Sequence, residues 1–332
     1  MLKRIRHHWI PQRVDGQNSP IIAEISSKPT AILLGAPDDR GVLNVGGRLG
    51  AGHGPAAIRQ MLGQFMLGMT GAISKIELQQ GFDIALGESI ESSHADMRHA
   101  VMTALQAGQT PIVLGGGHDY GYPHVAGASD AYGGNIALIN VDAHLDVRPP
   151  SPEGITSGSP FFLALENKVV RAERFVEFGI QDHCNDESYY KYAVEKGVRI
   201  MMLDETRTSG SPADVLEKLI EGFAKKKIHV VVSFDVDAIQ MAYAPGVSAP
   251  QSDGFTPAEF LKMAKLCGSN SNVATVGFFE FAPPLDEHQK TARLVATAIH
   301  RFLGGFSERD ALKKNKKRRN PVRRLLARTS RT

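Results

Sequence analysis

The stretch NIALINVDAHLD, residues 135–146, leads from a run of aliphatic residues into two aspartates and a histidine at alternate positions. A short apolar run bounded by polar residues is typical of a strand that is buried on both faces of a parallel sheet. In an extended chain, the side chains at i, i+2 and i+4 point to the same side. We therefore expect Asp142, His144 and Asp146 to converge at the end of such a strand.

Similar aliphatic runs recur along the chain and alternate with segments of helical periodicity. The runs expected to form strands are residues 30–37, 110–117, 135–142, 174–180, 199–205, 229–237 and 273–281. The segments expected to form helices are residues 54–65, 93–108, 186–197, 212–227, 256–268 and 289–305. This alternation shows neither an internal repeat nor a low-complexity linker. It predicts the α/β class, as a three-layer α/β/α sandwich in one domain over residues 1–308.

The composition sets limits on the class of protein. The chain has 332 residues, of which 42% are hydrophobic and 22% are charged, enough for a large buried core. Two cysteines, Cys184 and Cys267, are too few for a disulfide framework and lack C-x-x-C spacing. We therefore expect a reducing compartment and a cytoplasmic protein. Because no apolar run approaches the ~20 residues that span a bilayer, we expect no membrane association.

The net charge of +3 conceals a basic C-terminal tail, residues 309–332. This tail holds eleven Lys or Arg residues against one acid, Asp310, so it carries +10 and leaves −7 for residues 1–308. Such a tail could bind nucleic acid or an anionic membrane, but a terminal block of like charge is usually solvated and disordered. We assign it no catalytic role and do not expect nucleic acid as a partner.

Polar residues lie at the carboxyl ends of three of the expected strands. In an open parallel sheet, ligands bind outside the carboxyl ends of the strands, so these residues should share one rim. Four carboxylates and two imidazoles crowded there would raise one another's pKa values, a conflict that divalent cations remove. The absence of thiolates favours Mn²⁺ over a structural Zn²⁺, and six ligands suggest two metal ions. The expected ligands are His118, Asp142, His144, Asp146, Asp235 and Asp237.

Each motif on its own has a simpler explanation. A histidine or aspartate at a strand end is usually a turn former or a helix cap. The glycines at 115–117 could instead bind phosphate, but they lack the lysine of a Walker motif and G-x-G-x-x-G spacing. We interpret them as letting the backbone approach the metals. The joint occurrence of three motifs, each closing an apolar run, favours a metal site.

The motifs GGGHD (115–119), DAHLD (142–146) and SFDVD (233–237) resemble the three metal-binding signatures of the ureohydrolases, the superfamily of arginase, agmatinase and formimidoylglutamase. The resemblance covers residues 31–302 and implies an arginase-like fold with a mostly parallel sheet of about eight strands. It also implies two Mn²⁺ per chain. Asp142 and Asp235 would bridge the two ions, with His118 and Asp146 on one side and His144 and Asp237 on the other.

Other residues resemble the formimidoylglutamase branch in particular. AIQMAYAPGVSAP (238–250) stands where arginases continue with Asp-Pro, and Phe161 in TSGSPF takes the slot of the arginase proton-shuttle histidine. In FGIQDHCN (178–185), Cys184 takes the slot of an aspartate that holds the substrate amine in arginases. The segment NVGGRLGAGHGPAAIR (44–59) is also similar. Asp119 is a conservative departure, because that branch often has glutamate there.

The resemblance implies hydrolysis of a C–N bond of a linear amidine, N-formimidoyl-L-glutamate, to L-glutamate and formamide, a step of histidine degradation. Asp146 would orient the attacking hydroxide and relay its proton, and Glu280 would pair with the cationic amidinium. Phe161 cannot shuttle protons, so the leaving group would be protonated by Asp146, solvent or His183.

The dicarboxylate end of this substrate calls for basic residues. Arg148, two residues beyond the second motif, suits a bidentate grip on a carboxylate, and Arg48 is a second candidate. Gln181 and Asn185 match the pattern of the branch and are expected to bind substrate.

Two alternatives remain open. A ureohydrolase acting on another guanidino compound, such as agmatine, guanidinobutyrate or arginine, would release urea with the same metal chemistry. A non-catalytic metal-bound scaffold would use the basic tail to dock on nucleic acid. We also expect the chain to form a homo-oligomer. Its substrate should be a small amidine or guanidine that bears carboxylates.

Overall fold

A computed structural model of the chain describes residues 28–208 and 210–309. Its centre is one sheet of eight parallel strands in the order β2-β1-β3-β8-β7-β4-β5-β6. The strands are β1 (Thr30–Gly35), β2 (Glu77–Asp83), β3 (Thr110–Leu114), β4 (Ile136–Val141), β5 (Phe175–Ile180), β6 (Arg199–Met202), β7 (His229–Asp235) and β8 (Val273–Phe279). The predicted α/β/α class and the parallel sheet of about eight strands are confirmed.

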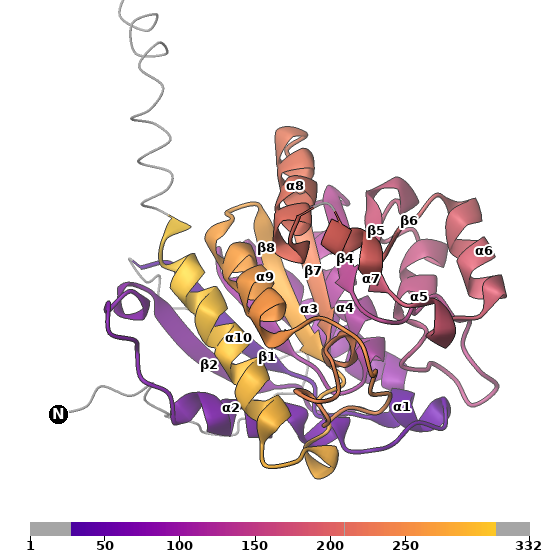
Figure 1. Ribbon diagram of the computed structural model, residues 1–332, viewed down its shortest axis with the longest axis horizontal. Helices are drawn as coiled ribbons and strands as arrows, with labels where there is room; N and C mark the ends of the chain where they lie inside the picture. The colour runs from indigo at the N-terminus through magenta and orange to yellow at the C-terminus, as the bar shows by residue number, and fades with distance from the viewer. Residues whose placement is uncertain (1–27, 209, 310–332) are drawn as a thin grey trace, which may run out of the picture.

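Helices cover both faces of the sheet and enclose one apolar core on each side. One face packs against α2 (Gly54–Gly63), α8 (Pro212–Lys225), α9 (Pro257–Ser269) and α10 (Lys290–Phe306). The other packs against α3 (Ile90–Gln106), α4 (Gly121–Ala131), α5 (Pro160–Glu166) and α6 (Glu187–Lys196). Figure 1 shows α9 and α10 side by side in front of the strands. The short helices α1 (Arg40–Asn44) and α7 (Leu203–Thr208) complete the fold.

Local sequence signals fix where the helices begin. Ser211 caps α8 and Thr256 caps α9, each in a capping box closed by an acid three residues later. A proline follows each cap, where its missing N–H costs no hydrogen bond. None of the helices in the described part of the chain combines the length and apolarity needed to cross a membrane.

All seven expected strands are present, and the structure adds one that the sequence analysis missed. Strand β2, ELQQGFD, lies at the edge of the sheet and every residue in it is partly exposed. Because an exposed edge strand has no need of a continuous apolar run, its sequence lacks the pattern by which the buried strands were predicted. All seven expected strands are shorter than predicted, most of all β6 and β3, because α7 begins at Leu203 and the glycine turn 115–117 follows Leu114.

The glycine turn, residues 115–117, packs closely against its neighbours. A Cβ on Gly116 would lie 1.8 Å from the carbonyl oxygen of Asp38, and one on Gly115 would lie 2.1 Å from the Phe279 ring. These two glycines therefore let the turn pack against the loop after β1 and against β8, and the predicted approach of the backbone to metals stays a prediction.

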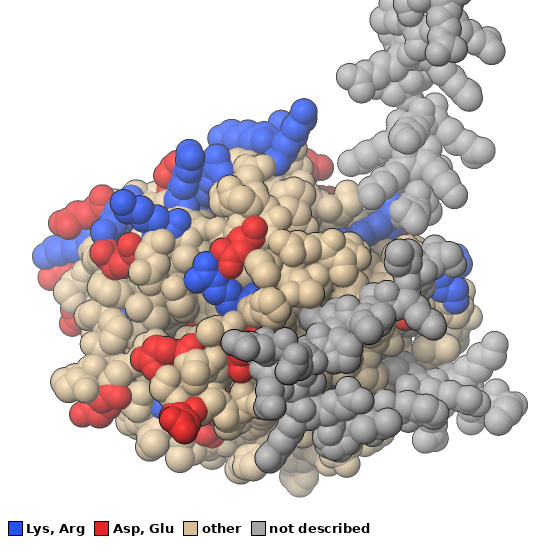
Figure 2. Space-filling view, turned by 180° about the vertical axis from the view of Figure 1, so that it is seen from behind, with Lys and Arg blue, Asp and Glu red and all other residues tan. Residues whose placement is uncertain are grey.

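The first residue assigned to the basic tail belongs structurally to the domain. The Arg309 guanidinium lies 4.6 Å from the centre of the Phe306 ring and donates a 3.1 Å hydrogen bond to the Cys267 carbonyl at the end of α9. The rest of the tail, residues 310–332, lies outside the described residues. On the face of the domain seen in Figure 2, acidic and basic side chains are interspersed.

Candidate metal centre

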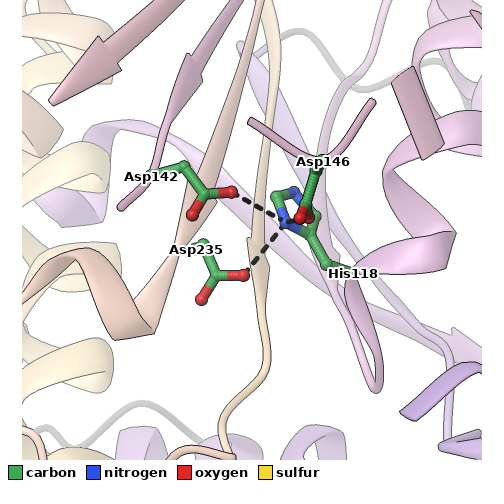
Figure 3. A group of neighbouring side chains, drawn as sticks. All are labelled: His118, Asp142, Asp146 and Asp235. Atoms are coloured by element: carbon green, nitrogen blue, oxygen red, sulfur yellow. Dashed lines mark ion pairs between the residues drawn. The ribbon is translucent and has the colours of Figure 1, made fainter. Parts of the chain in front are cut away.

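Three strands near the centre of the sheet bring the first group of polar residues together. His118 follows β3, Asp142 follows β4, and Asp235 ends β7. His118 Nδ1 lies 2.9 Å from Asp146 Oδ2, 3.0 Å from Asp235 Oδ2 and 3.2 Å from Asp142 Oδ2. Figure 3 shows the three carboxylates converging on the imidazole. All four side chains are buried.

A second group adjoins the first. His144 Nδ1 lies 3.0 Å from Asp237 Oδ2 and 3.6 Å from Asp142 Oδ1. Asp142 therefore belongs to both groups, with one oxygen facing each. The structure thus brings together all six predicted ligands and places Asp142 between the two positions. The second expected bridge, Asp235, groups with His118 only, so its bridging role stays a prediction.

The two groups converge through tight turns, which differs from the predicted extended geometry. Strand β4 ends at Val141, the Asp142 carboxylate accepts a 2.8 Å hydrogen bond from the His144 N–H, and Asp146 has a positive φ of 48°. Asp235 likewise accepts a 2.8 Å hydrogen bond from the Asp237 N–H. Aspartate commonly closes such turns on its own backbone. The alternate spacing therefore predicted which side chains converge, although they do so through a different local conformation.

The spacing of these ligand atoms fits divalent cations. In an octahedral site with bonds of ~2.1 Å, adjacent ligand atoms lie about 3 Å apart, close to the separations around His118 Nδ1. None of those contacts has hydrogen-bond geometry, so Nδ1 is buried without a hydrogen-bond partner in the described structure. Asp237 Oδ1 is likewise buried without a hydrogen-bond partner among the described residues. Carboxylates and imidazoles without thiolates form a donor set suited to Mn²⁺.

The pKa shifts in this cluster show that protein groups alone do not balance its charge. Burial acts to lower the pKa of His118, but the three surrounding carboxylates outweigh it and raise that pKa well above its ordinary value. Burial and the charges of Asp237 and Asp142 raise the pKa of Asp235 strongly. A bound cation would supply the missing positive charge and displace these protons.

Groups on the side of the imidazole away from the carboxylates fix the orientation of His118. Its Nε2 lies 2.8 Å from the Ser233 hydroxyl, which leaves Nδ1 to face the carboxylates. Its ring stacks on Phe279 at a centroid distance of 4.9 Å and meets the edge of Phe161 at 5.3 Å. Sequence analysis did not identify Ser233, although it opens the third motif, because its contact depends on the pairing of β7 with distant strands.

A cavity of about 340 Å³ opens onto the cluster. The predicted residues Glu280, Arg148 and Arg48 line it, together with His118, His144, Asp146, Asp235 and Asp237. Glu280 is buried at a positive φ of 65°, and its Oε1 accepts a 2.7 Å hydrogen bond from the His118 N–H. A non-glycine residue held at such a φ is characteristic of functional sites. Burial, followed by the charge of Asp235, raises the pKa of Glu280 well above its ordinary value.

Two predicted substrate ligands lie elsewhere. Gln181 and Asn185 are not among the residues that line this cavity. The Gln181 amide donates a 3.1 Å hydrogen bond to the Asp253 carbonyl. The Asn185 amide donates to the Ala143 carbonyl at 2.9 Å and accepts from the Leu145 N–H at 2.8 Å. The geometry thus gives Asn185 a part in shaping the loop between Asp142 and Asp146, and substrate binding by either amide stays a prediction.

Comparison with known proteins agrees with this architecture and site. The arginase family model matches residues 29–304, so the chain belongs to the arginase family. A formimidoylglutamase of Corynebacterium efficiens is 30% identical over 305 residues, covering 88% of this chain and 93% of that protein. A formimidoylglutamase of Geobacillus thermodenitrificans is 34% identical over 270 residues, covering 80% and 81%.

Solved structures give the same result. A Trypanosoma cruzi formiminoglutamase structure with Mn²⁺ superimposes with a TM-score of 0.79 at 31% sequence identity, covering 85% of this chain and 94% of that chain. A formimidoylglutamase from Bacillus subtilis superimposes with a TM-score of 0.77 at 25% identity, covering 90% and 89%.

Proposed function

We propose that this chain is a dimanganese hydrolase that cleaves N-formimidoyl-L-glutamate to L-glutamate and formamide. The observation that carries the proposal is one cavity lined by five of the six metal-ligand side chains, an acid and two arginines, with the sixth ligand, Asp142, buried beside them. The buried ligands lie deeper than the partly exposed Arg148. A substrate with a cationic amidine at one end and carboxylates at the other matches this gradient from acidic to basic. The relatives named formimidoylglutamase support the same reaction.

The residues present would hold two Mn²⁺ ions, with Asp142 shared between them. The chemistry that Mn²⁺ supplies when bound is a lower pKa for water, which makes hydroxide available near neutral pH. The protein contributes the ligand charges, the burial that strengthens them, and the tight turns that set their spacing.

The side chains of the cavity account for the remaining steps. The Asp146 carboxylate can accept a proton from the attacking water and pass it to the glutamate nitrogen, as the bond from that nitrogen to the formimidoyl carbon breaks. Glu280 would pair with the amidinium, since the His118 N–H already fixes one of its oxygens. His183 is exposed and lies 3.1 Å from the Gln251 side chain, outside the cavity lining, which leaves Asp146 as the protein group for this transfer.

Arg148 is the best-placed group for a substrate carboxylate. Within the described residues, no acid pairs with its guanidinium, and the Tyr189 ring lies 5.7 Å from it. Its side chain runs across Gly158, where a Cβ would lie 2.7 Å from Arg148 Cδ. Arg48 is more constrained, because its guanidinium donates to the carbonyls of Val247 at 2.7 Å and Ser248 at 2.9 Å.

The alternative of a urea-releasing ureohydrolase shares the metal chemistry. Against it stands Phe161, which is fully buried beside His118 and cannot relay a proton. A product screen separates the two functions. Protein loaded with Mn²⁺ is incubated with N-formimidoyl-L-glutamate, L-arginine, agmatine and guanidinobutyrate, and formamide, urea and ammonia are measured. Fastest release of formamide from N-formimidoyl-L-glutamate is expected, whereas faster release of urea would refute the assignment. Release of no product at all would favour the non-catalytic scaffold.

A further inference from the structure

A buried polar pair lies directly beneath the metal centre and takes no part in the chemistry described above. Asn140 on β4 and Glu177 on β5 face each other in register across adjacent parallel strands. Both side chains are fully buried, and neither lines the cavity. A carboxyl group in the middle of a buried strand costs free energy unless a partner satisfies it. Such a pair therefore calls for an explanation.

The hydrogen bonds connect this pair to a metal ligand. Asn140 Nδ2 donates one hydrogen to Asp142 Oδ2 at 3.0 Å and the other to Glu177 Oε2 at 2.9 Å. The other oxygen of Asp142, Oδ1, accepts from the His144 N–H at 2.8 Å. Both carboxylate oxygens of Asp142 are thus held. Since one oxygen faces each ligand group, the carboxylate plane is fixed in the orientation that a bridge requires.

Glu177 accounts for the orientation of the Asn140 amide. An asparagine amide can rotate by half a turn and exchange its oxygen with its nitrogen. In the exchanged position, the amide oxygen would face two carboxyl oxygens, one from Asp142 and one from Glu177, and both hydrogen bonds would be lost. With a carboxyl group on each side, the amide keeps its donors toward Asp142. A neutral amide also leaves the negative charge of Asp142 available to a cation, which a lysine or arginine would not.

We propose that Asn140 and Glu177 form a positioning pair that holds the Asp142 carboxylate as the bridge between the two metal ions. The pair contacts neither substrate nor metal and acts only through Asp142. The inference rests on the dimanganese part of the proposed function and not on the identity of the substrate.

Substitutions that preserve or remove each contact test the pair. Asn140→Leu and Glu177→Leu remove the hydrogen bonds at similar volume, whereas Glu177→Gln keeps an acceptor toward Asn140. Glutamine matches glutamate in size and keeps a side-chain oxygen that can accept from Asn140. The matched control is Thr275→Val. Thr275 is fully buried and donates a 2.9 Å hydrogen bond to the Pro111 carbonyl, yet it has no contact with a ligand of the metal centre.

The measurements are Mn²⁺ bound per chain at a series of free Mn²⁺ concentrations and the electron paramagnetic resonance signal of a coupled pair of ions. Both leucine variants should bind Mn²⁺ about 10- to 100-fold more weakly, the range typical of lost hydrogen bonds to metal ligands, and should lose the coupled signal. Glu177→Gln and Thr275→Val should keep two ions and that signal.

Thermal unfolding of the metal-free proteins separates loss of metal from loss of fold. If Asn140→Leu does not fold, Asn140→Ser, whose hydroxyl cannot donate to both carboxyls, replaces it with the same expectation. Wild-type Mn²⁺ affinity with an intact coupled signal in the leucine variants would overturn the proposal, as would an equal loss of metal in Thr275→Val. Because these readouts use no substrate, a wild-type protein that binds two ions but releases no formamide would refute only the proposed reaction.

Discussion

Replacing Arg148 with alanine tests how the cavity recognises its substrate. The guanidinium lines the cavity and, within the described residues, has no acid as a partner, so a substrate carboxylate would be its ion-pair partner. Removing one member of a hydrogen-bonded charge pair in an interface costs about 2–5 kcal/mol. Because Arg148 is partly exposed, solvent screens the pair, and we expect the lower part of this range.

A loss of about 2–3 kcal/mol corresponds to a fall of about 30- to 150-fold in kcat/KM, carried at least as much by KM as by kcat. Arg148→Lys should recover only part of it, because an ammonium lacks the planar fork of the guanidinium. Arg98→Ala removes a different arginine, one that is paired with Asp130 on the surface, and should stay within about twofold of wild type.

The assay compares N-formimidoyl-L-glutamate with formamidine, which has the same reacting carbon but no carboxylate. Steady-state formamide release should fall for the first substrate and remain unchanged for the second. An unchanged KM for N-formimidoyl-L-glutamate in Arg148→Ala would show that the arginine does not grip the carboxylate. An equal loss on both substrates would show instead that the substitution damages the metal centre.

Four further results are expected. Chelation should abolish activity and Mn²⁺ should restore it; an active preparation without a divalent transition metal in elemental analysis would refute this. His144→Asn and Asp237→Asn should each bind less metal while keeping a wild-type circular dichroism spectrum, and near-normal turnover in both would place the metals elsewhere. Asn185→Ala should lower the free energy of unfolding in urea by about 1–3 kcal/mol with little change in KM, because its amide holds backbone groups; a large rise in KM would instead support substrate binding. Burial, opposed by His144 and reinforced by Asp142, raises the pKa of Asp237 to about 6. Its usual value is 3.8, so the metal-free folded state binds this proton more tightly than the unfolded chain does and loses stability as pH rises from about 4 to 6. Mn²⁺ must displace the same proton, so the rise in melting temperature on adding Mn²⁺ should grow from pH 5 to 7; a constant rise would contradict this.

The sequence was sufficient for the buried strands and for the cluster of six polar side chains at their ends. Buried parallel strands are continuous apolar runs, and the polar residues that interrupt them stand out. It was insufficient for β2, whose polar residues fit an edge position, and for α4, in which glycine and proline obscure the helical pattern. Gly127 shows why glycine is present in α4: a Cβ there would lie 2.5 Å from the Arg98 carbonyl on α3. Close packing between helices thus removed the signal that would have revealed one of them.

The supporting residues of the site are harder to find in the sequence. Ser233, Asn140 and Glu177 act through neighbours on other strands, so their contacts depend on the strand order and not on local spacing. Asn185 was identified by resemblance, but its amide proved to bond the backbone. Cysteine content and the lack of a long apolar run predicted a cytoplasmic protein, and a homo-oligomer was also expected; both properties stay predictions.

The strand order also bears on the kinetics of unfolding. Strand β8 comes last in the sequence, yet it lies between β3, which His118 follows, and β7, which ends at Asp235. Five of the ligands come from β4 and β7, which pair directly, whereas His118 reaches them only when β8 lies between β3 and β7. A chain in which β8 is not in place lacks His118 in the first ligand group, so we expect Mn²⁺ to bind the native state preferentially and to stabilise it in proportion to the logarithm of its concentration. Interactions that are absent from the folding transition state slow unfolding and leave the folding rate unchanged. Bound Mn²⁺ should thus slow the unfolding of the enzyme and lengthen the lifetime of the folded state, without raising the folding rate.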